Sequence, residues 1–218
     1  MNKKEILQKF TKPEDKLLVA KILDKITFAK MKNKIINTEM LDLYQKSIAE
    51  KIVLNDGVKS IFFGGYEGAE RTCLILYPEK LDEEIVRRTY KMIFKLIRIK
   101  LPNDLKGKYQ HKNYLGAIMK TGIKREKVGD ILTREDGADI IVQADIAEYL
   151  SDELSKLTRF SKSKIEIIEI DELLINSNKK EEINIMVQSI RIDSIVSELI
   201  KTSRTKAEEI IYARKSIY

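Results

Sequence analysis

The chain of 218 residues carries 41 Lys and Arg against 34 Asp and Glu, a formal net charge of +7. Its 43% hydrophobic content is enough for packed cores, which excludes a disordered or collagen-like chain. The single cysteine, Cys73, excludes an internal disulfide and a cysteine-based zinc site. Because no run of about 18 apolar residues occurs, we expect a cytoplasmic protein without a membrane span, a cofactor or a metal.

The first quarter of the chain, up to Leu54, contains no glycine. Its apolar residues recur at three- and four-residue intervals, as in Met40, Leu41, Tyr44 and Ile48, and this spacing predicts three helices. Twelve lysines oppose seven acidic residues here. This excess of positive charge would either attract a polyanion or form an ordinary solvated helical surface.

After Gly57 the pattern changes to short runs of β-branched and aromatic residues. Residues 58–63 and 72–77 are predicted strands, and the intervening glycines, Gly64, Gly65 and Gly68, predict a tight turn. These glycines have neither the Rossmann spacing nor the Gly-Lys-Ser/Thr ending of a phosphate-binding loop. Residues 1–85 are therefore predicted to form an N-terminal domain of helices and a β-hairpin.

The next region, residues 86–175, alternates between strand and helix patterns. The predicted strands are 92–101, 128–132, 138–143 and 164–170, and the predicted helices are 113–120 and 145–157. The order βαββαβ predicts a ferredoxin-like sheet with two helices on one face, the architecture of many RNA-recognition modules (RRM-like). The fold class is thus α+β.

Three basic residues, Lys124, Arg125 and Lys127, lie in the predicted loop before the second strand of this region. They could contact phosphate, with Arg125 binding through two nitrogens, or they could be solvated side chains of a capped loop. Asp130, in a predicted turn, could accept hydrogen bonds from backbone N–H groups.

Three further residues leave alternatives open. His111 could be a general base, a helix cap or a stacking partner for RNA. Cys73 is bracketed by apolar strand residues, which is typical of an inert core cysteine. Arg71 could form an internal ion pair with Glu70 or contact RNA, and we expect the structural role.

The last segment, residues 183–218, contains an apolar stripe for one helix and a second, shorter helix. The stripe consists of Ile192, Ile195, Val196, Leu199 and Ile200. Thr202-Ser203 is predicted to offer an N-cap to the second helix. Arg204 and Lys206 stand in its first turn, where the helix dipole disfavours cations, and a bound phosphate would compensate for this.

The segment also resembles a known RNA-binding module. Arg191-Ile192-Asp193, the apolar helix and then Ser203 to Ile211 resemble the start of the domain named after small-subunit ribosomal protein four, here called the S-four domain. The resemblance implies RNA contacts at this corner. Since that family continues into a β-hairpin, we expect residues 183–218 to be an incomplete S-four domain that contains only the helices.

The candidate RNA-binding residues are then Arg191, Ser203, Arg204, Lys206, Arg214 and Lys215 at the corner, with Lys124, Arg125 and Lys127 in the central region. No catalytic residue is predicted.

A wider resemblance covers nearly the whole chain. Residues 37–42, 64–71, 111–117 and 122–131 resemble the bacterial YlmH family, in the same order along the chain. The resemblance implies a cytoplasmic RNA-binding protein with an N-terminal region, an RRM-like domain and an S-four domain. It further implies association with the large ribosomal subunit and rescue of stalled chains held on peptidyl-tRNA.

We therefore expect a monomeric, ribosome-associated factor that binds structured rRNA or tRNA without catalysis. One alternative is an RNA-modifying enzyme such as a pseudouridine synthase, but no second Arg-Leu-Asp-type motif outside Arg191-Ile192-Asp193 and no glycine-rich cofactor loop is visible. Another alternative is a cell-division or membrane-surface scaffold, for which the helix around Leu17 is a weak candidate.

Overall fold

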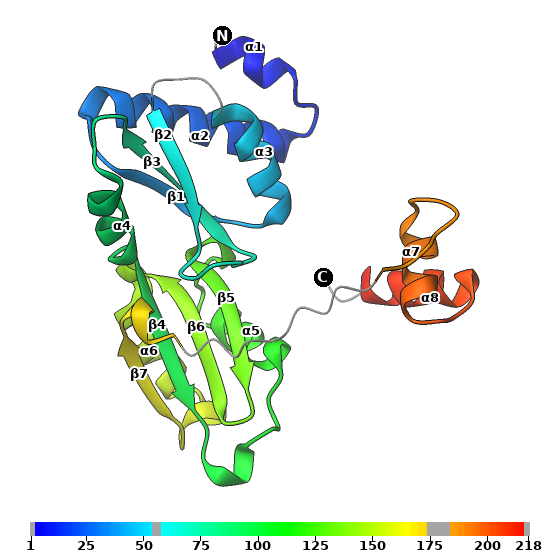
Figure 1. Cartoon of the computed structure of the whole chain (residues 1–218). Helices are drawn as coiled ribbons and strands as arrows, with labels where there is room; N and C mark the ends of the chain where they lie inside the picture. The colour runs from blue at the N-terminus through cyan, green and yellow to red at the C-terminus, as the bar shows by residue number, and fades with distance from the viewer. Residues whose placement is uncertain (1–2, 54–57, 174–183, 216–218) are drawn as a thin grey trace. The chain divides into compact units, whose positions relative to one another are not determined.

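The computed structural model describes residues 3–53, 58–173 and 184–215, apart from the side chains of Glu83, Tyr90, Arg214 and Lys215. The chain divides into two compact units, Met1–Ile175 and Asn176–Tyr218 (Figure 1). The first unit contains both of the first two predicted domains, and their boundary at residue 85 stays a prediction. The fold is mixed α and β, with antiparallel sheets, as expected.

The N-terminal part of the first unit is a three-stranded antiparallel sheet covered by helices. Its elements are α1 (Lys3–Gln8), α2 (Pro13–Lys32), β1 (Ile36–Leu41), α3 (Leu43–Val53), β2 (Val58–Phe63) and β3 (Thr72–Pro78). The strand order is β1-β3-β2, and the three helices lie on one side of the sheet (Figure 1). Ile22 and Ile26 of α2 pack there against Leu74 and Leu76 of β3.

Strand β1 corrects the expectation of an all-helical start. Met40 and Leu41 were predicted in a helix, but Met40 pairs with Cys73 and Leu41 with Thr72 of β3. Strand β3 is buried along its whole length, so it needs a neighbour on each edge, and β1 provides the second one. The predicted hairpin of β2 and β3 is therefore part of a larger sheet.

The central part of the unit follows a short helix, α4 (Glu83–Lys91), which was not predicted. Its main elements are β4 (Phe94–Lys100), α5 (His111–Lys120), β5 (Val128–Arg134), β6 (Gly137–Gln143), α6 (Ala147–Lys156) and β7 (Lys164–Ile168). Three short 3-10 helices matter below: η2 (Arg125–Lys127), η4 (Thr158–Phe160) and η5 (Ile170–Glu172). The element order is the predicted βαββαβ, and the strands are arranged β5-β6-β4-β7.

Strand β4 has two buried faces, and they belong to different cores. Ile97 and Ile99 contribute to a core with α5 and α6, which includes Tyr114 and Leu150. Leu96, on the alternate face with Phe94, packs in a core that includes residues from β1 and β3 of the N-terminal sheet. The N-terminal sheet therefore covers part of the central sheet on the face opposite α5 and α6.

The second unit contains α7 (Ile192–Leu199) and α8 (Arg204–Lys215), as predicted. The apolar stripe of α7 is not a buried face within the described residues: Ile192 is 65% exposed and Leu199 47%. The buried positions of α7 are instead Asp193 and Ser194. This helix thus turns a polar face inward, toward Ala207 and Arg204 of α8.

Candidate nucleic-acid interface

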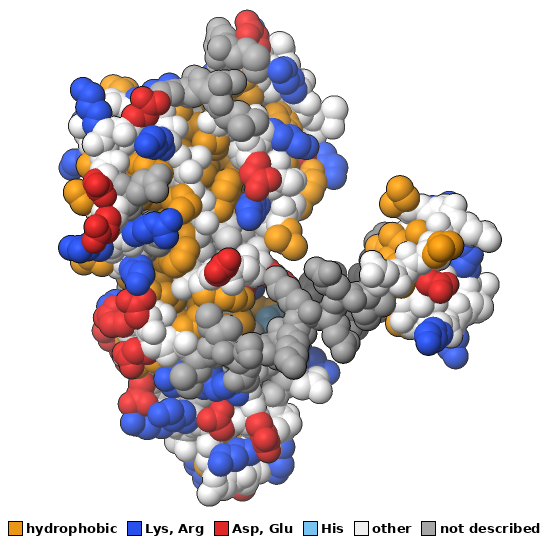
Figure 2. Space-filling model, viewed as in Figure 1, with side chains coloured by type: hydrophobic (Ala, Val, Ile, Leu, Met, Phe, Trp, Pro, Cys, Tyr) orange, Lys and Arg blue, Asp and Glu red, His pale blue; other side chains and the backbone are white. Residues whose placement is uncertain are grey.

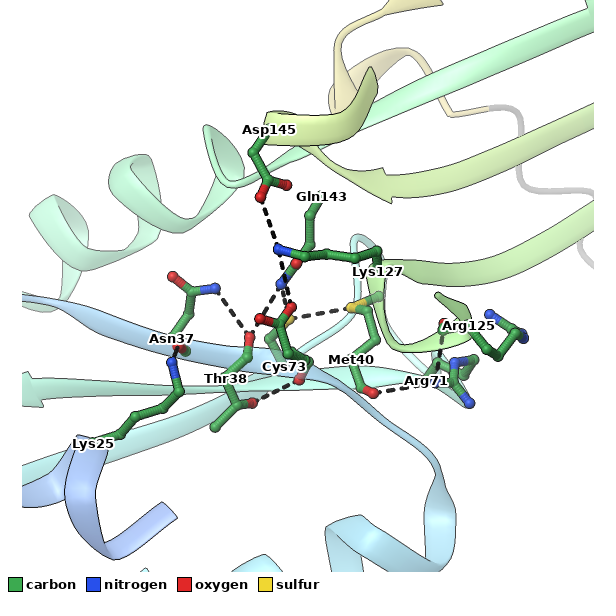
Figure 3. Close-up of polar contacts among 11 residues, drawn as sticks. Lys25, Asn37, Thr38, Met40, Arg71, Cys73, Arg125, Lys127, Gln143 and Asp145 are labelled. Atoms are coloured by element: carbon green, nitrogen blue, oxygen red, sulfur yellow. Dashed lines mark hydrogen bonds and ion pairs between the residues drawn. The ribbon is translucent and has the colours of Figure 1, made fainter. Parts of the chain in front are cut away.

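The predicted basic loop, Lys124 to Lys127, is held by internal contacts. Arg125 in η2 donates to the carbonyl oxygens of Val128 and Gly129, the latter at 3.0 Å. Lys127 pairs with Asp145 at 2.7 Å and with Glu39 of β1 at 3.2 Å (Figure 3). Lys124 is exposed. Of the three candidates in this loop, only Lys124 presents its charge to solvent without a described ion pair.

The charge and burial of Arg125 explain why its side chain binds within the fold. Burial, with the nearby guanidinium of Arg71 adding to it, lowers the pKa of Arg125 to about 10, so the side chain is still a cation at neutral pH. Buried cations require acceptors, and here backbone carbonyls supply them. RNA contact by Arg125 stays a prediction, and it would compete with these bonds.

Asp130 joins the glycine-rich segment 64–71 to the central sheet. Its carboxylate accepts from the backbone N–H groups of Glu70 (2.8 Å) and Arg71 (3.0 Å) and from the hydroxyl of Tyr66 (2.9 Å). The prediction that Asp130 accepts from backbone N–H groups is confirmed, but Asp130 lies in strand β5 and not in a turn. Burial and the hydrogen bond to Asp130 raise the pKa of the Tyr66 phenol.

Arg71 reinforces the same junction. It donates from Nε to the carbonyl oxygen of Val128 (3.0 Å) and from Nη2 to that of Met40 (3.1 Å). Arg71 therefore links β1 and β5, a structural role carried by backbone carbonyl oxygens and not by the expected ion pair with Glu70. The predicted tight turn also fits, because a Cβ on Gly64 would lie 2.1 Å from the carbonyl oxygen of Arg71.

A buried polar cluster lies between the two sheets. Gln143 donates to the carbonyl oxygen of Thr38 (3.1 Å) and lies 3.6 Å from the Cys73 sulfur (Figure 3). Cys73 also lies 3.2 Å from the sulfur of Met40. Burial raises the pKa of the Cys73 thiol to about 12, so the thiol is protonated and unreactive at neutral pH.

The remaining part of the central sheet's second face carries ion pairs. Arg98 binds Asp139 with two nitrogens, both at 2.8 Å, and Arg134 binds the same carboxylate at 2.9 Å. Burial would raise the pKa of Asp139, but the two guanidinium groups outweigh it and hold this pKa below its ordinary value. Figure 2 shows blue and red side chains interleaved over this part of the molecule.

In the second unit, the predicted corner is present, and it contains a polar cluster. Arg204 donates to Ser194 and, at 3.0 Å, to Ser189, and it lies 3.6 Å from Asp193. Arg191 pairs with the same Asp193 at 3.0 Å. A hydrogen bond from Arg191 holds the pKa of Asp193 below its ordinary value. The corner arginines are thus partly committed to holding α7 against α8.

The start of α8 is capped as predicted. The Ser203 hydroxyl accepts from the backbone N–H of Lys206 at 3.3 Å, and the Lys206 side chain is exposed. The side chains of Arg214 and Lys215 lie outside the described residues. His111 is exposed at the first position of α5. The structure therefore gathers Arg191, Ser203, Arg204 and Lys206 in one corner, and sequence reasoning missed Asp193 as the acid that organises it.

Among residues 3–53, 58–173 and 184–215, no three His, Cys, Asp or Glu side chains gather in a way that could hold a metal ion. In the same described part of the chain, none of the helices combines the length and the apolar run that crossing a bilayer would take.

In comparisons with known proteins, a family model matches the central part of the chain and a curated relative matches most of it. Residues 88–172 match the family model described as "Putative RNA-binding domain in YlmH". The chain is 28% identical over 179 residues to "Ribosome-associated protein quality control protein P2" of Bacillus subtilis (strain 168). That match covers 80% of this chain and spans 65% of the relative's length, which is less than two thirds.

A solved structure shares the fold. "Cell division protein ylmH from Streptococcus pneumoniae" superposes with a TM-score of 0.57 at 20% identity, over 73% of this chain and 93% of that one. The matched region 88–172 includes the motifs at residues 111–117 and 122–131. The chain is therefore similar to the YlmH family, whose RNA-binding domain model matches residues 88–172.

Proposed function

We propose that this protein is a non-catalytic RNA-binding factor that acts at the ribosome, through folded rRNA or tRNA of the large subunit. The observation that carries the proposal is the match of residues 88–172 to a family described as RNA-binding. The name of the Bacillus relative, a ribosome-associated quality control protein, supports the ribosome as the place of action. A role on stalled large subunits that carry peptidyl-tRNA is the finer form of the same proposal.

The capped start of α8 supports a phosphate contact in the second unit. Lys206 is exposed in the first turn of a helix that has no acid in that turn, so an anion there would meet both the lysine and the helix dipole. Arg204 keeps its side chain 53% exposed while it bonds to Ser189 and Ser194. A guanidinium fixed in this way is preorganised for phosphate, because part of its entropy is already lost.

Binding to purified large ribosomal subunits and to deproteinised large-subunit rRNA tests the proposal. We expect cosedimentation with the subunit, and an rRNA affinity that falls steeply as salt is raised, because phosphate contacts release counterions. If the protein neither cosediments with the subunit nor binds the rRNA, the proposal is contradicted. Appearance of a modified nucleotide or a cleaved RNA during incubation would contradict its non-catalytic part.

The Lys206→Ala substitution tests the contribution of the corner. We expect it to weaken rRNA binding and to reduce the salt slope by about 1, as loss of one phosphate contact should. Lys206 is a cleaner target than Arg204, since its side chain has no described partner in the fold. The matched control is Lys59→Ala, which removes an exposed lysine from β2 and should leave affinity and slope unchanged. If Lys206→Ala and Lys59→Ala change rRNA affinity and salt slope equally, the corner does not contribute to RNA binding.

A further inference from the structure

The face of the central sheet opposite α5 and α6 is partly covered within this chain. The N-terminal sheet covers Phe94, Leu96 and Ile141, and η5 lies beside β4, where Arg98 donates to the carbonyl oxygen of Glu172 at 2.8 Å. RNA-recognition modules that read bases on such a sheet do so with exposed aromatic rings. In the described strands β4 to β7 the one aromatic residue, Phe94, is fully buried. An RNA bound by this region should therefore use another surface.

The outer face of α5 has the charge that such a surface needs. Lys112, Gly116 and Lys120 follow one another at four-residue intervals and are all exposed, so they share one side of the helix. The helix contains no Asp or Glu. The neighbouring helix α6, on the same side of the sheet, carries three acids among its ten residues. Positive charge is thus concentrated on α5 and not on α6.

The glycine at position 116 indicates a binding partner that approaches α5 closely. A glycine inside a helix lowers helix stability relative to alanine. At this position a Cβ would meet nothing within 4 Å, so packing within the chain does not require glycine. The missing side chain leaves a shallow place between Lys112 and Lys120 where a nucleic-acid backbone could approach the helix.

Two exposed side chains are fixed at the ends of the same helix. Arg159 from η4 donates to the carbonyl oxygen of Asn113 at 2.6 Å and lies over the ring of Tyr109, 5.6 Å from its centroid. Tyr149 of α6 donates to the carbonyl oxygen of Thr121 at 3.1 Å, and it is 51% exposed. A fixed guanidinium suits phosphate, and a fixed exposed ring suits the stacking of an unpaired base.

We propose that this side of the molecule contacts the phosphate backbone of folded RNA. The surface, called the α5 face below, consists of Lys112, Gly116, Lys120, Lys124, Tyr149 and Arg159. The lysines and Arg159 neutralise phosphates, Gly116 allows close approach of the strand, and Tyr149 stacks on a base at one end. The inference rests on the proposed RNA-binding function and specifies where the region 88–172 would carry it out.

A charge-matched pair of triple variants in the full chain tests the α5 face against deproteinised large-subunit rRNA. The first variant combines Lys112→Gln, Lys120→Gln and Lys124→Gln. We expect it to weaken binding about tenfold or more near 100 mM salt and to reduce the salt slope by about 3, one for each phosphate contact. The second combines Lys95→Gln, Lys100→Gln and Lys164→Gln, lysines of β4 and β7 that are paired with acids of the fold. We expect it to change neither the affinity nor the slope.

Substitutions of Gly116 separate folding from binding. Gly116→Ala should raise the melting temperature by about 2 °C, since it adds a better helix former in open space. Gly116→Gln should leave melting unchanged or higher while it weakens rRNA binding, because its side chain fills the place of closest approach. A Gly116→Gln variant that binds rRNA as tightly as the unaltered chain would count against close approach at α5.

Directed hydroxyl-radical probing locates the RNA independently of affinity. An iron chelate attached to Gly116→Cys should cleave the bound rRNA, and the same chelate at Lys100→Cys should not. The native thiol does not interfere, because Cys73 is buried.

The outcomes distinguish this inference from the proposed function. If the unaltered chain binds neither subunits nor rRNA, the proposed function fails and the α5 face fails with it. If the chain binds rRNA but the first triple variant keeps its affinity and slope, the α5 face alone is overturned. Cleavage from position 100 in place of 116 would also overturn it, in favour of the opposite side of the sheet.

Discussion

At the scale of single residues, the Asp130 carboxylate stabilises the fold through its hydrogen bonds. It lies in β5 of the central sheet and binds two backbone N–H groups and a hydroxyl from the segment between β2 and β3. A turn rich in glycine is costly to order, so a single acceptor with several donors is an efficient way to fix it. The position of Tyr66, Glu70 and Arg71 thus depends on one side chain that is 59 to 64 residues away in sequence.

Removing this carboxylate should destabilise the fold. We expect Asp130→Ala to lower the free energy of unfolding by about 2–4 kcal/mol, because two backbone donors and the Tyr66 hydroxyl lose a charged acceptor. Urea unfolding measures this. The control, Tyr66→Phe, removes one of the three bonds and should cost about 1 kcal/mol. Equal costs for the two variants would show that the backbone donors find other partners.

Asp139 is the second residue whose charge the fold requires. Its side chain is fully buried between Arg98 and Arg134. We expect Asp139→Asn to cost about 3–5 kcal/mol in unfolding free energy, because two guanidinium groups lose their buried counterion. Glu166→Gln, at a half-exposed pair with Lys100 and Lys164, should cost less than about 1 kcal/mol.

The same residue predicts a dependence on pH. The pKa of Asp139 is lower in the folded chain than its ordinary value of 3.8. The folded state therefore binds the proton less tightly than the unfolded state, so this contribution to stability is present above pH 3.8 and is lost as pH falls below it. Acid unfolding followed by circular dichroism should show a shallower acid limb for Asp139→Asn. An identical acid limb would exclude Asp139 as a source.

At the scale of elements, the contact between β1 and β5 holds the two sheets together. Arg71 bridges the carbonyl oxygens of Met40 and Val128, and Lys127 of η2 pairs with Glu39 of β1. The strand pairing of β5 with β6 is irregular between Val128 and Ile131, where Gly129 lies. Met40 of β1 lies close to the backbone at this irregularity.

Gly129→Ala should weaken this contact. A Cβ at Gly129 would lie 2.5 Å from Cε of Met40 and 3.1 Å from Cβ of Ile141, so a neighbouring side chain must move. We expect a loss of about 1–3 kcal/mol in unfolding free energy, as for other overpacked sites. Thermal melts of Gly129→Ala and Gly116→Ala check this expectation. The same substitution at the open position 116 should stabilise the fold. If both variants melt alike, close packing of β1 on β5 is refuted.

At the scale of the whole molecule, the two units differ in how much apolar surface they bury. The first unit contains three hydrophobic clusters, whereas in residues 184–215 Ala207 is the one hydrophobic residue that is fully buried. Small units with little buried apolar area are marginally stable alone. The first unit should therefore fold independently of the second.

We expect a fragment of residues 1–175 to melt cooperatively, at a temperature within a few degrees of the full chain. A fragment of residues 176–218 alone should show little cooperative melting by circular dichroism. A cooperative transition in the short fragment, or loss of it in the long one, would contradict the division of stability between the units.

The sequence by itself determined the parts of the protein that depend on local pattern. The βαββαβ order followed from the spacing of apolar residues, and the Ser203 cap and the corner between α7 and α8 followed from capping chemistry. The motifs also indicated the resemblance to the YlmH family, since their residues and order can be read directly from the chain.

Only the tertiary structure decided which basic residues are free. Arg125 and Lys127 look like RNA ligands in the sequence, but carbonyl groups and acids from β1 and from residue 145 occupy them. Lys112 and Lys120 are not among the RNA-binding residues predicted from the sequence, yet they are exposed on α5. Strand β1 was likewise decided by the open edge of β3 and not by local spacing. The physical reason is the same in each case: a charge or a strand edge is satisfied by partners that are distant in sequence, and only folding brings them together.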